Sequence, residues 1–300
     1  MRKLIIIDGN AIIHRAYHST PPFKAASGQV VNAVYGFTSM LLTLIKNQLP
    51  DCLALTFDMK GPTFRHEEYS EYKATRTAAP DDLYAQIPLI KDIVKAFDIP
   101  IYELQGFEAD DIIGTLALQA QDNSDIITYI VTGDRDTYQL VNDQVKIIVP
   151  DKGFATPKII DREAVFERYQ LTPHQIVDLK ALQGDTSDNI KGVAGIGPKT
   201  ATNLLQEYQS LENIYQNIDR IPGRIKEKLL QDQESAFLSK RLATIITDAP
   251  IKINFSACTF NPNPDLILGI LQEFQFTSLI RRFNALPKHT VVSENQQTLF

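Results

Sequence analysis

The sequence has little cysteine and no long hydrophobic run. Its 300 residues contain two cysteines, Cys52 and Cys258, which are too few and too far apart for a disulfide framework or a cysteine metal site. The N-terminus, MRKLIIIDGN, reaches an aspartate after the four apolar residues LIII, which is too short for a secretion signal. No stretch approaches the roughly 18 apolar residues of a membrane span. We therefore expect a cytoplasmic protein that does not bind a membrane.

The sequence also lacks an excess of positive charge and the common nucleotide-binding motifs. The formal net charge of −6 argues against a protein that coats nucleic acid through bulk charge. No Walker A loop and no GxGxxG motif follows the first apolar run, so nucleotide-fuelled and dinucleotide-dependent enzymes are disfavoured. No serine or cysteine triad signature is present. With 44% hydrophobic residues, the chain is long enough for two packed domains.

Short apolar runs alternate with helical patterns in the first half of the chain. The strand candidates are the runs 4–7, 53–57, 99–104, 127–131 and 145–149. The helical patterns between them cover 31–48, 81–97 and 108–121. This alternation predicts an α/β fold with a mostly parallel, doubly wound sheet.

The second half of the chain has a different pattern. After about residue 165 the strand candidates stop, and amphipathic patterns such as TPHQIVDLKAL and PKTATNLLQEY follow, both with a proline near the helix start. We predict an α/β domain over 1–165, a helical domain over 166–286 and a flexible tail over 287–300.

Acidic residues stand where the predicted strands end. Asp8 follows the first run, Asp58 follows the second, and Asp134 and Asp136 follow the run 127–131. One such aspartate alone would be ordinary turn chemistry. Because ligands bind at the carboxyl edge of open parallel sheets, three strands that end this way indicate that the carboxylates converge on a site.

Two further acidic clusters add to this set. GFEADD, residues 106–111, contributes Glu108, Asp110 and Asp111 at the start of a predicted helix, and GDTSDN contributes Asp185 and Asp188. Taken alone, an acidic first turn can simply complement the helix macrodipole. Crowded carboxylates, however, need counter-cations, and oxygen ligands without histidine or cysteine favour Mg²⁺ or Mn²⁺. Two such ions can hydrolyse a phosphodiester, so phosphoryl chemistry is the leading class.

Two stretches could hold nucleic acid. FRHEEYSEYKATR, residues 64–76, combines Arg65, Lys73 and Arg76 with Tyr72, which suits phosphate binding and base stacking. It could equally be a solvated helix face on which Glu67, Glu68 and Glu71 balance the charge. GVAGIGPKTA, residues 192–201, allows a close backbone approach and presents a cation and free amides where a phosphate could dock, although a glycine-rich turn can be a mere connector. The residues concerned are Gly195, Gly197, Lys199 and Thr200.

The order of these motifs resembles one family. IIIDGN, FRHEEYSEYKATR, GFEADDIIG, VTGDRDTYQLV, ALQGDTSDNIKGVAGIGPKTA and LQEFQFTSLIRRF stand in the order typical of the 5′-nuclease domain of bacterial DNA polymerase I and related standalone flap endonucleases. The resemblance covers roughly residues 1–286. It implies a structure-specific 5′ nuclease with 5′-3′ exonuclease and flap endonuclease activity, which removes flaps and RNA primers in replication and repair.

The resemblance also implies roles for residues. All nine carboxylates match metal ligands of the family pattern, with two or three Mg²⁺ ions for which Mn²⁺ can substitute. One metal site is assigned Asp8, Asp58, Glu108, Asp110 and Asp111, and the other is assigned Asp134, Asp136, Asp185 and Asp188. Lys73 and Arg76 match catalytic residues on an arch over 64–90 that engage the scissile phosphate. The turn at 192–199 matches a helical hairpin that binds duplex DNA, with a K⁺ ion as a further expectation.

Besides the 5′ nuclease, two interpretations stay open at this level. An RNase of a related metal-dependent fold is disfavoured by the second helical domain, and a non-catalytic binding module is disfavoured by the complete set of acids. The sequence does not distinguish a standalone protein from the front of a polymerase. We expect a nucleoid-associated monomer that acts on flapped DNA and RNA–DNA junctions. The last five residues, QQTLF (Gln296–Phe300), look like the short peptides that dock on bacterial sliding clamps, although a chance match is the alternative.

Overall fold

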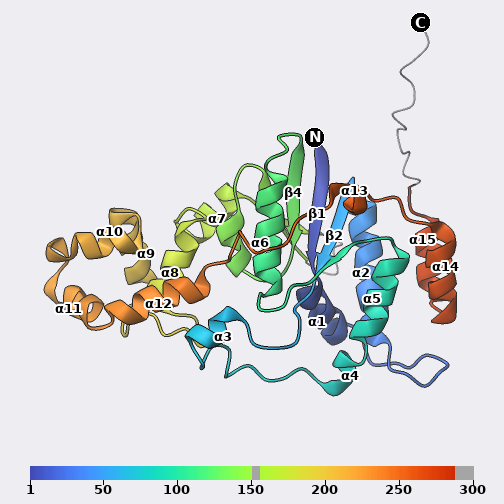
Figure 1. Cartoon of the computed structure of the whole chain (residues 1–300), viewed down its shortest axis with the longest axis horizontal. Coiled ribbons are helices and arrows are strands. Elements are labelled where there is room, and N and C mark those ends of the chain that lie inside the picture. Colours follow the sequence, from blue (N-terminus) through green and yellow to red (C-terminus); the bar gives the residue numbers. More distant parts are fainter. Residues whose placement is uncertain (151–155, 288–300) are drawn as a thin grey trace, which may run out of the picture.

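The computed structural model of the chain describes residues 1–150 and 156–287 (Figure 1). Its centre is a six-stranded sheet with the order β3-β2-β1-β4-β5-β6. The strands are β1 (Arg2–Asp8), β2 (Cys52–Thr56), β3 (Ile101–Tyr102), β4 (Ile126–Val131), β5 (Val145–Val149) and β6 (Lys158–Ile160). All neighbouring pairs are parallel except β5 and β6, which are antiparallel. The predicted mostly parallel α/β sheet is confirmed, and β6 is an edge strand that the sequence reading missed.

Helices cover both faces of this sheet. The helices between the strands are α1 (Gly9–Ser19), α2 (Asn32–Gln48), α3 (Phe64–Glu68), α4 (Asp81–Tyr84), α5 (Ile87–Ala96), α6 (Ala109–Ala120) and the 3-10 helix η1 (Asp136–Leu140). Ile5 and Ile7 of β1 belong to the core on the side of α1, α2 and α5, whereas Leu4 and Ile6 belong to the core on the side of α6. A strand with apolar side chains on both faces is what a parallel sheet between two helical layers requires.

The helical pattern predicted for 81–97 is two helices. Pro88 occupies the first turn of α5, and a proline ring both lacks the N–H of a continuous helix and favours a helix start. Gln86, just before α5, is fully buried, and its Oε1 accepts hydrogen bonds from Ala33 N (2.8 Å) and Val34 N (3.3 Å) at the start of α2. The break therefore supplies α2 with acceptors for its free N-terminal amides.

The helical part of the chain extends to one side of the sheet (Figure 1). It comprises α7 (Arg162–Tyr169), α8 (Gln175–Gln183), α9 (Pro198–Tyr208), α10 (Leu211–Gln216), η3 (Ile218–Arg220), α11 (Gly223–Gln231) and α12 (Gln233–Ala243). A separate apolar core, which includes Leu182, Leu205 and Leu229, joins α8 to α12. Because this core is separate from the sheet, the second part of the chain has helical patterns in its sequence where the first part alternates strands and helices.

The chain after α12 returns to the first domain. It forms α13 (Phe255–Cys258), α14 (Pro264–Glu273) and α15 (Thr277–Asn284). Ile267 and Leu279 are fully buried in the same core as α2 and α5, and Cys258 lies in the core of α6. The predicted helical domain over 166–286 is therefore wrong for its last forty or so residues, because their apolar side chains complete the α/β core. The predicted tail lies outside the described residues from 288 onward.

Candidate active site

Several predicted acids lie in fixed positions at the edge of the sheet where the parallel strands end. Asp8 ends β1 and caps α1: its Oδ1 accepts from Ala11 N (3.0 Å) and its Oδ2 accepts from the Thr132 hydroxyl (2.7 Å). Asp58 follows β2, and its carboxylate accepts from Ala109 N at the start of α6 (2.7 Å) and from the Asn10 amide. Because these partners are backbone amides or short side chains, both carboxylates are held in one orientation.

Five of the nine acids line one hollow of about 360 Å³. They come from the ends of β1, β2 and β4 and from the start of α6, and Lys73 and Arg76 line the same hollow. The five are Asp8, Asp58, Glu108, Asp110 and Asp134. Convergence of separate strand ends was the reason for predicting a site at this edge.

A second hollow of about 930 Å³ adjoins the first. Asp134 and Arg76 line both hollows, so the two share a wall. The second hollow is also lined by Asp136, Asp185 and Lys180. The structure therefore brings seven of the nine predicted ligands onto two neighbouring surfaces, and Asp188 is bonded to Arg76 at their boundary.

Burial and mutual repulsion raise the pKa of several carboxylates in this region. Burial, followed by the charges of Asp8, Asp134 and Asp136, raises the pKa of Asp110 well above its ordinary value. Burial is also the main reason that the pKa of Asp8 rises to about 6. The pKa of Asp136 rises to about 7 through burial, although Lys180 opposes the shift. Because burial and crowding disfavour the ionised form of these carboxylates, the region favours the binding of cations.

Basic side chains neutralise part of this charge. Lys73 Nζ lies 2.7 Å from Glu108 Oε1, and Arg76 is bonded to Asp188. Lys180 donates to both Asp136 and Asp185. Burial alone would raise the pKa of Asp185, but the hydrogen bonds from Lys180 and Ser187 hold it below its ordinary value.

Lys180 is a site residue that the sequence analysis missed. It stands five residues before Asp185, on the helix that leads into GDTSDN. Lys180 belongs neither to the acids at strand ends nor to the cations of 64–76. Its position one and a half turns before an acidic cluster was the available signal.

The donor set fits divalent cations by its chemistry. The hollow offers carboxylate oxygens, which suit Mg²⁺ and Mn²⁺, and burial together with neighbouring carboxylates raises the pKa of Asp110. Within 1–150 and 156–287, no three acidic, histidine or cysteine side chains meet closely enough to form a metal site as they stand. Lys73, Arg76 and Lys180 form ion pairs with four of the carboxylates, so a metal ion held by those four would have to displace the cations. The four are Glu108, Asp136, Asp185 and Asp188.

Asp111, Arg65 and Tyr72 are buried and line neither hollow. Asp111 is fully buried and Arg65 is 2% exposed, and the two form a bidentate pair with both distances at 2.7 Å. Burial leaves Arg65 no access to DNA, so its placement does not support the predicted DNA contact. Asp111 points away from the hollow and makes a capping box with Glu108, which is the ordinary helix-start function left open for GFEADD. Tyr72, predicted to contact DNA, is also buried, with its hydroxyl 3.2 Å from Glu108 and from Asp188.

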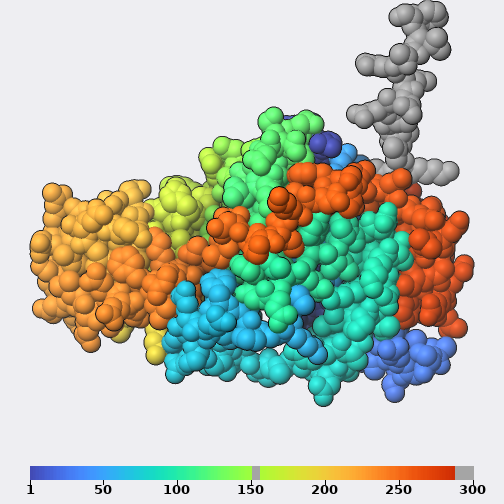
Figure 2. Space-filling model, viewed as in Figure 1, coloured from blue at the N-terminus to red at the C-terminus, as the bar shows by residue number. Residues whose placement is uncertain are grey.

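The segment from 64 to 84 runs along one edge of the molecule. It passes from α3, beside the helical part, to α4 below α1 and α5 (Figures 1 and 2). Lys73 has a left-handed backbone (φ 55°), and its N–H donates to Asp188 O at 3.0 Å. This contact ties the segment to the GDTSDN loop and aims Lys73 at Glu108.

The glycine-rich turn at 192–199 precedes and begins α9, and it is exposed in part: Gly192, Val193 and Ile196 are buried. Gly197 caps α9, and Lys199 is exposed in its first turn. A Cβ at Gly192 would lie 2.3 Å from Gly184 N, and its φ is 66°, so this position requires glycine. Lys228 of α11 donates to Gly195 O at 2.7 Å and brings a second cation to this turn. Gly195, Gly197 and Lys199 are exposed, and Thr200 is half-buried.

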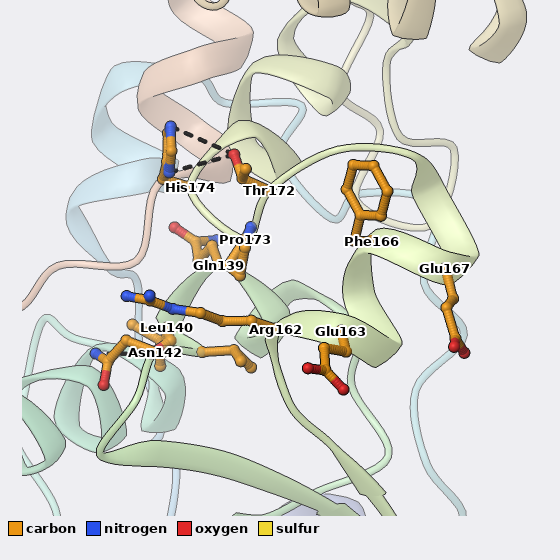
Figure 3. Close-up of a pocket in the computed structure, with 11 residues that line it drawn as sticks. Gln139, Leu140, Asn142, Arg162, Glu163, Phe166, Glu167, Thr172, Pro173 and His174 are labelled. Carbon is orange, nitrogen blue, oxygen red and sulfur yellow. Dashed lines mark hydrogen bonds between the residues drawn. The ribbon is translucent and has the colours of Figure 1, made fainter.

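Another hollow, of about 830 Å³, lies between η1, α7 and the start of α8 (Figure 3). Its wall includes Arg162, Phe166 and His174, and the Thr172 hydroxyl is hydrogen-bonded to the His174 ring. None of the nine predicted carboxylates lines it. The candidate active site is therefore the smaller carboxylate hollow. None of the helices formed by the described residues is long and apolar enough to cross a membrane.

Known proteins resemble this chain in fold and in sequence. Residues 3–170 match the family domain described as 5′-3′ exonuclease, N-terminal resolvase-like domain, and residues 171–265 match 5′-3′ exonuclease, C-terminal SAM fold. The bacteriophage T5 D15 flap endonuclease, crystallised with DNA and metal ions, has the same fold with a TM-score of 0.67 and 22% identity, over 94% of this chain and 98% of that chain. The likeness to the T5 enzyme concerns the fold alone.

Two bacterial relatives align over nearly the whole chain. DNA polymerase I of Caldicellulosiruptor bescii is 44% identical over 283 residues, which is 93% of this chain and 33% of that protein. DNA polymerase I of Bacillus subtilis is 38% identical over 300 residues, which is 99% of this chain and 34% of that protein. The chain spans about a third of the length of these curated relatives. With two consecutive family domains matched from residue 3 to residue 265, this chain belongs to the 5′-3′ exonuclease family.

Proposed function

We propose that this chain is a structure-specific 5′ nuclease that hydrolyses phosphodiesters at 5′ flaps and RNA primers in replication and repair. The observation that carries the proposal is the hollow in which carboxylates from β1, β2, β4 and α6 meet Lys73 and Arg76. Such a surface can hold a phosphate only together with cations. The proposed setting is DNA in the cytoplasm, at the nucleoid, with the protein acting as a monomer.

Divalent cations complete the proposed site. Two or three Mg²⁺ ions, or Mn²⁺ in their place, would supply a nucleophilic water and neutralise the phosphate when bound. Asp8, Asp58, Glu108 and Asp110 would hold ions on one side of the site. Asp134, Asp136, Asp185 and Asp188 would hold ions on the other.

The chain's own residues orient this site. Thr132 and Ala11 N fix the Asp8 carboxylate, and Ala109 N fixes Asp58, so neither has to reorganise when charge develops. Lys73 and Arg76 hold carboxylates in the structure, and we propose that they exchange these partners for the phosphate oxygens of the substrate. Both cations would then stand beside the bond that breaks.

The turn at 192–199 is the proposed contact with duplex DNA. It presents exposed backbone at Gly195 and Gly197 and a cation at Lys199, which suits the phosphate backbone. A K⁺ ion at this turn is part of the proposal. The duplex contact would place the branch point of a flapped substrate near the carboxylate hollow.

The experiment that tests this function is cleavage of a labelled 5′-flapped duplex, beside an unstructured RNA, with and without EDTA. We expect metal-dependent cutting of the flap and little cutting of the RNA. Preferential cutting of the RNA would favour the RNase alternative. Binding of the flap without any cutting would favour a non-catalytic module.

Lys199→Ala should weaken duplex binding without a comparable loss of kcat. The exposed ammonium contributes to affinity through release of counterions, so the slope of log affinity against log salt should fall by about one. Fluorescence anisotropy at several salt concentrations measures this slope. Lys46→Ala is the matched control, because Lys46 is exposed in the last turn of α2. Equal slopes in the two variants would remove Lys199 from the duplex contact.

We propose the sliding clamp as a partner of the last five residues, which lie outside the described part of the chain. Leu299 and Phe300 would be apolar anchors, and Gln296 would orient the peptide. Deletion of 296–300 should abolish clamp binding in a calorimetric titration and leave cleavage of free flaps unchanged. If the intact chain shows no clamp binding at high micromolar concentration, this partner is wrong and the nuclease proposal is unaffected.

A further inference from the structure

A buried ion pair lies next to the candidate active site without lining it. The Arg65 guanidinium and the Asp111 carboxylate face each other in a bidentate arrangement, with Nη1 to Oδ2 and Nη2 to Oδ1 both at 2.7 Å. Asp111 is fully buried and Arg65 is 2% exposed. Bidentate pairs of this kind combine a strong interaction with a fixed geometry.

This pair joins three distant segments of the chain. Arg65 lies on α3, and two further N–H groups of its guanidinium donate to Leu242 O (2.8 Å) and Thr244 O (2.7 Å) at the end of α12. Asp111 lies in the first turn of α6 and also accepts from Ile246 N (2.8 Å). The start of the 64–84 segment, the start of α6 and the chain leaving the helical part are therefore held at one point.

The hydrogen bonds of Asp111 leave no place for a metal ion. Its Oδ1 accepts from Arg65 and Ile246 N, and its Oδ2 accepts from Arg65 and Glu108 N (3.1 Å). Four donors use the lone pairs that a carboxylate offers. Asp110, its neighbour in sequence, lines the hollow instead. Adjacent residues on a helix point in different directions, so only one of the two can face the site.

Glu108 connects the pair to the hollow. Its backbone N–H is bound by Asp111, and its Oε2 lies 3.5 Å from Arg65 Nη1. Its Oε1 lies 2.7 Å from Lys73 Nζ, so Glu108 stands between the buried pair and the cation of the 64–84 segment. A shift of Arg65 or Asp111 would displace both Glu108 and α3, which precedes Lys73 in the chain.

We propose that Arg65 and Asp111 are a positioning pair, and that Asp111 is not a metal ligand. The pair sets the place of Glu108 in the hollow and anchors the base of the segment that carries Lys73 and Arg76. This inference rests on the proposed nuclease function for its effect on catalysis. Its structural content, which concerns metal count and the anchoring of α3, can be tested without any cleavage.

The test uses the full chain and three variants. Asp111→Asn removes one charge but leaves Arg65 buried without its partner, so this variant can fail to fold. The double variant Arg65→Met, Asp111→Leu removes both charges and keeps an apolar filling, which buried ion pairs often tolerate. Asp110→Asn is the matched control, because it changes the neighbouring acid that does line the hollow.

Three readouts are measured. Calorimetric titration with Mn²⁺ alone gives the number of ions bound, and hydrogen–deuterium exchange over 64–76 reports the anchoring of α3. We expect the double variant to bind as many Mn²⁺ ions as the parent chain and to exchange faster over 64–76. Its kcat on a flapped duplex should fall by about 10- to 100-fold, as is usual for residues that orient metal ligands, with a smaller change in KM. Asp110→Asn should bind fewer ions and leave exchange over 64–76 unchanged.

Two results would overturn the inference. Loss of a Mn²⁺ ion in the double variant, as in Asp110→Asn, would make Asp111 a ligand. Unchanged exchange over 64–76 would mean that the pair anchors nothing beyond itself. If the parent chain did not cut flaps at all, the proposed function would fail, whereas the exchange result would still decide whether the pair holds α3.

Discussion

Asp110→Asn should lower kcat on a 5′-flapped duplex by about 100- to 1000-fold, the scale seen when a preorganised group that stabilises the transition state is removed. Asp110 lines the hollow, and burial together with Asp8, Asp134 and Asp136 raises its pKa, so its charge belongs to a cluster that favours cations. The amide of Asn is a weaker ligand for Mg²⁺ and carries no charge. Single-turnover cleavage at fixed, low Mg²⁺ measures the effect.

Stability and binding separate this effect from misfolding. Asn relieves repulsion among crowded carboxylates, so the thermal midpoint should not fall, and flap binding in Ca²⁺ should be kept or improved. Asp122→Asn is the control, because it makes the same charge change at an exposed position just beyond the C-terminal end of α6. Near-parental cleavage by Asp110→Asn would remove Asp110 from the reaction.

The second large effect concerns the cations of the 64–84 segment. Lys73→Ala and Arg76→Ala should each lower kcat by about 100-fold and change duplex affinity much less, because both side chains line the hollow and lie outside the turn at 192–199, which is the proposed duplex contact. The same reasoning gives Lys199→Ala the opposite split. Single-turnover rates at saturating enzyme give kcat, and anisotropy in Ca²⁺ gives affinity.

Lys46→Ala is again the control for loss of one positive charge. If Lys73→Ala, Arg76→Ala and Lys199→Ala all reduced affinity equally and left kcat alone, the two cations would be ordinary duplex contacts. The proposed exchange of partners from carboxylate to phosphate would then be wrong.

The sheet and most of the hollow follow from local sequence patterns. Runs such as LIII are apolar at every position, which is the pattern of a strand covered on both faces, and β1 is buried in that way. Asp8 and Asp58 directly follow such runs and Asp134 stands three residues after one, and topology alone brings the carboxyl ends of parallel strands together. These three acids could therefore be placed in one hollow without any knowledge of side-chain geometry.

Other features depend on tertiary contacts that no local pattern contains. Asp110 and Asp111 are both acids in the first turn of α6, and only the position of Arg65, 46 residues away in sequence, shows which one faces the hollow. The return of α14 and α15 to the α/β core depends on the match of apolar surfaces. Arg65 stands in a stretch whose cations suggest phosphate binding. Because it is buried and paired, it cannot bind phosphate.

The dependence of flap cleavage on Mg²⁺ tests the central claim most directly, since the hollow is proposed to cut phosphodiesters only through cations held by its carboxylates. The measurement is the single-turnover rate on a labelled 5′-flapped duplex, from excess EDTA to saturating Mg²⁺. The account predicts no cleavage in EDTA, and a rate that rises more steeply than the first power of Mg²⁺ concentration, because more than one ion takes part. Cleavage that persists at the same rate in excess EDTA would contradict it.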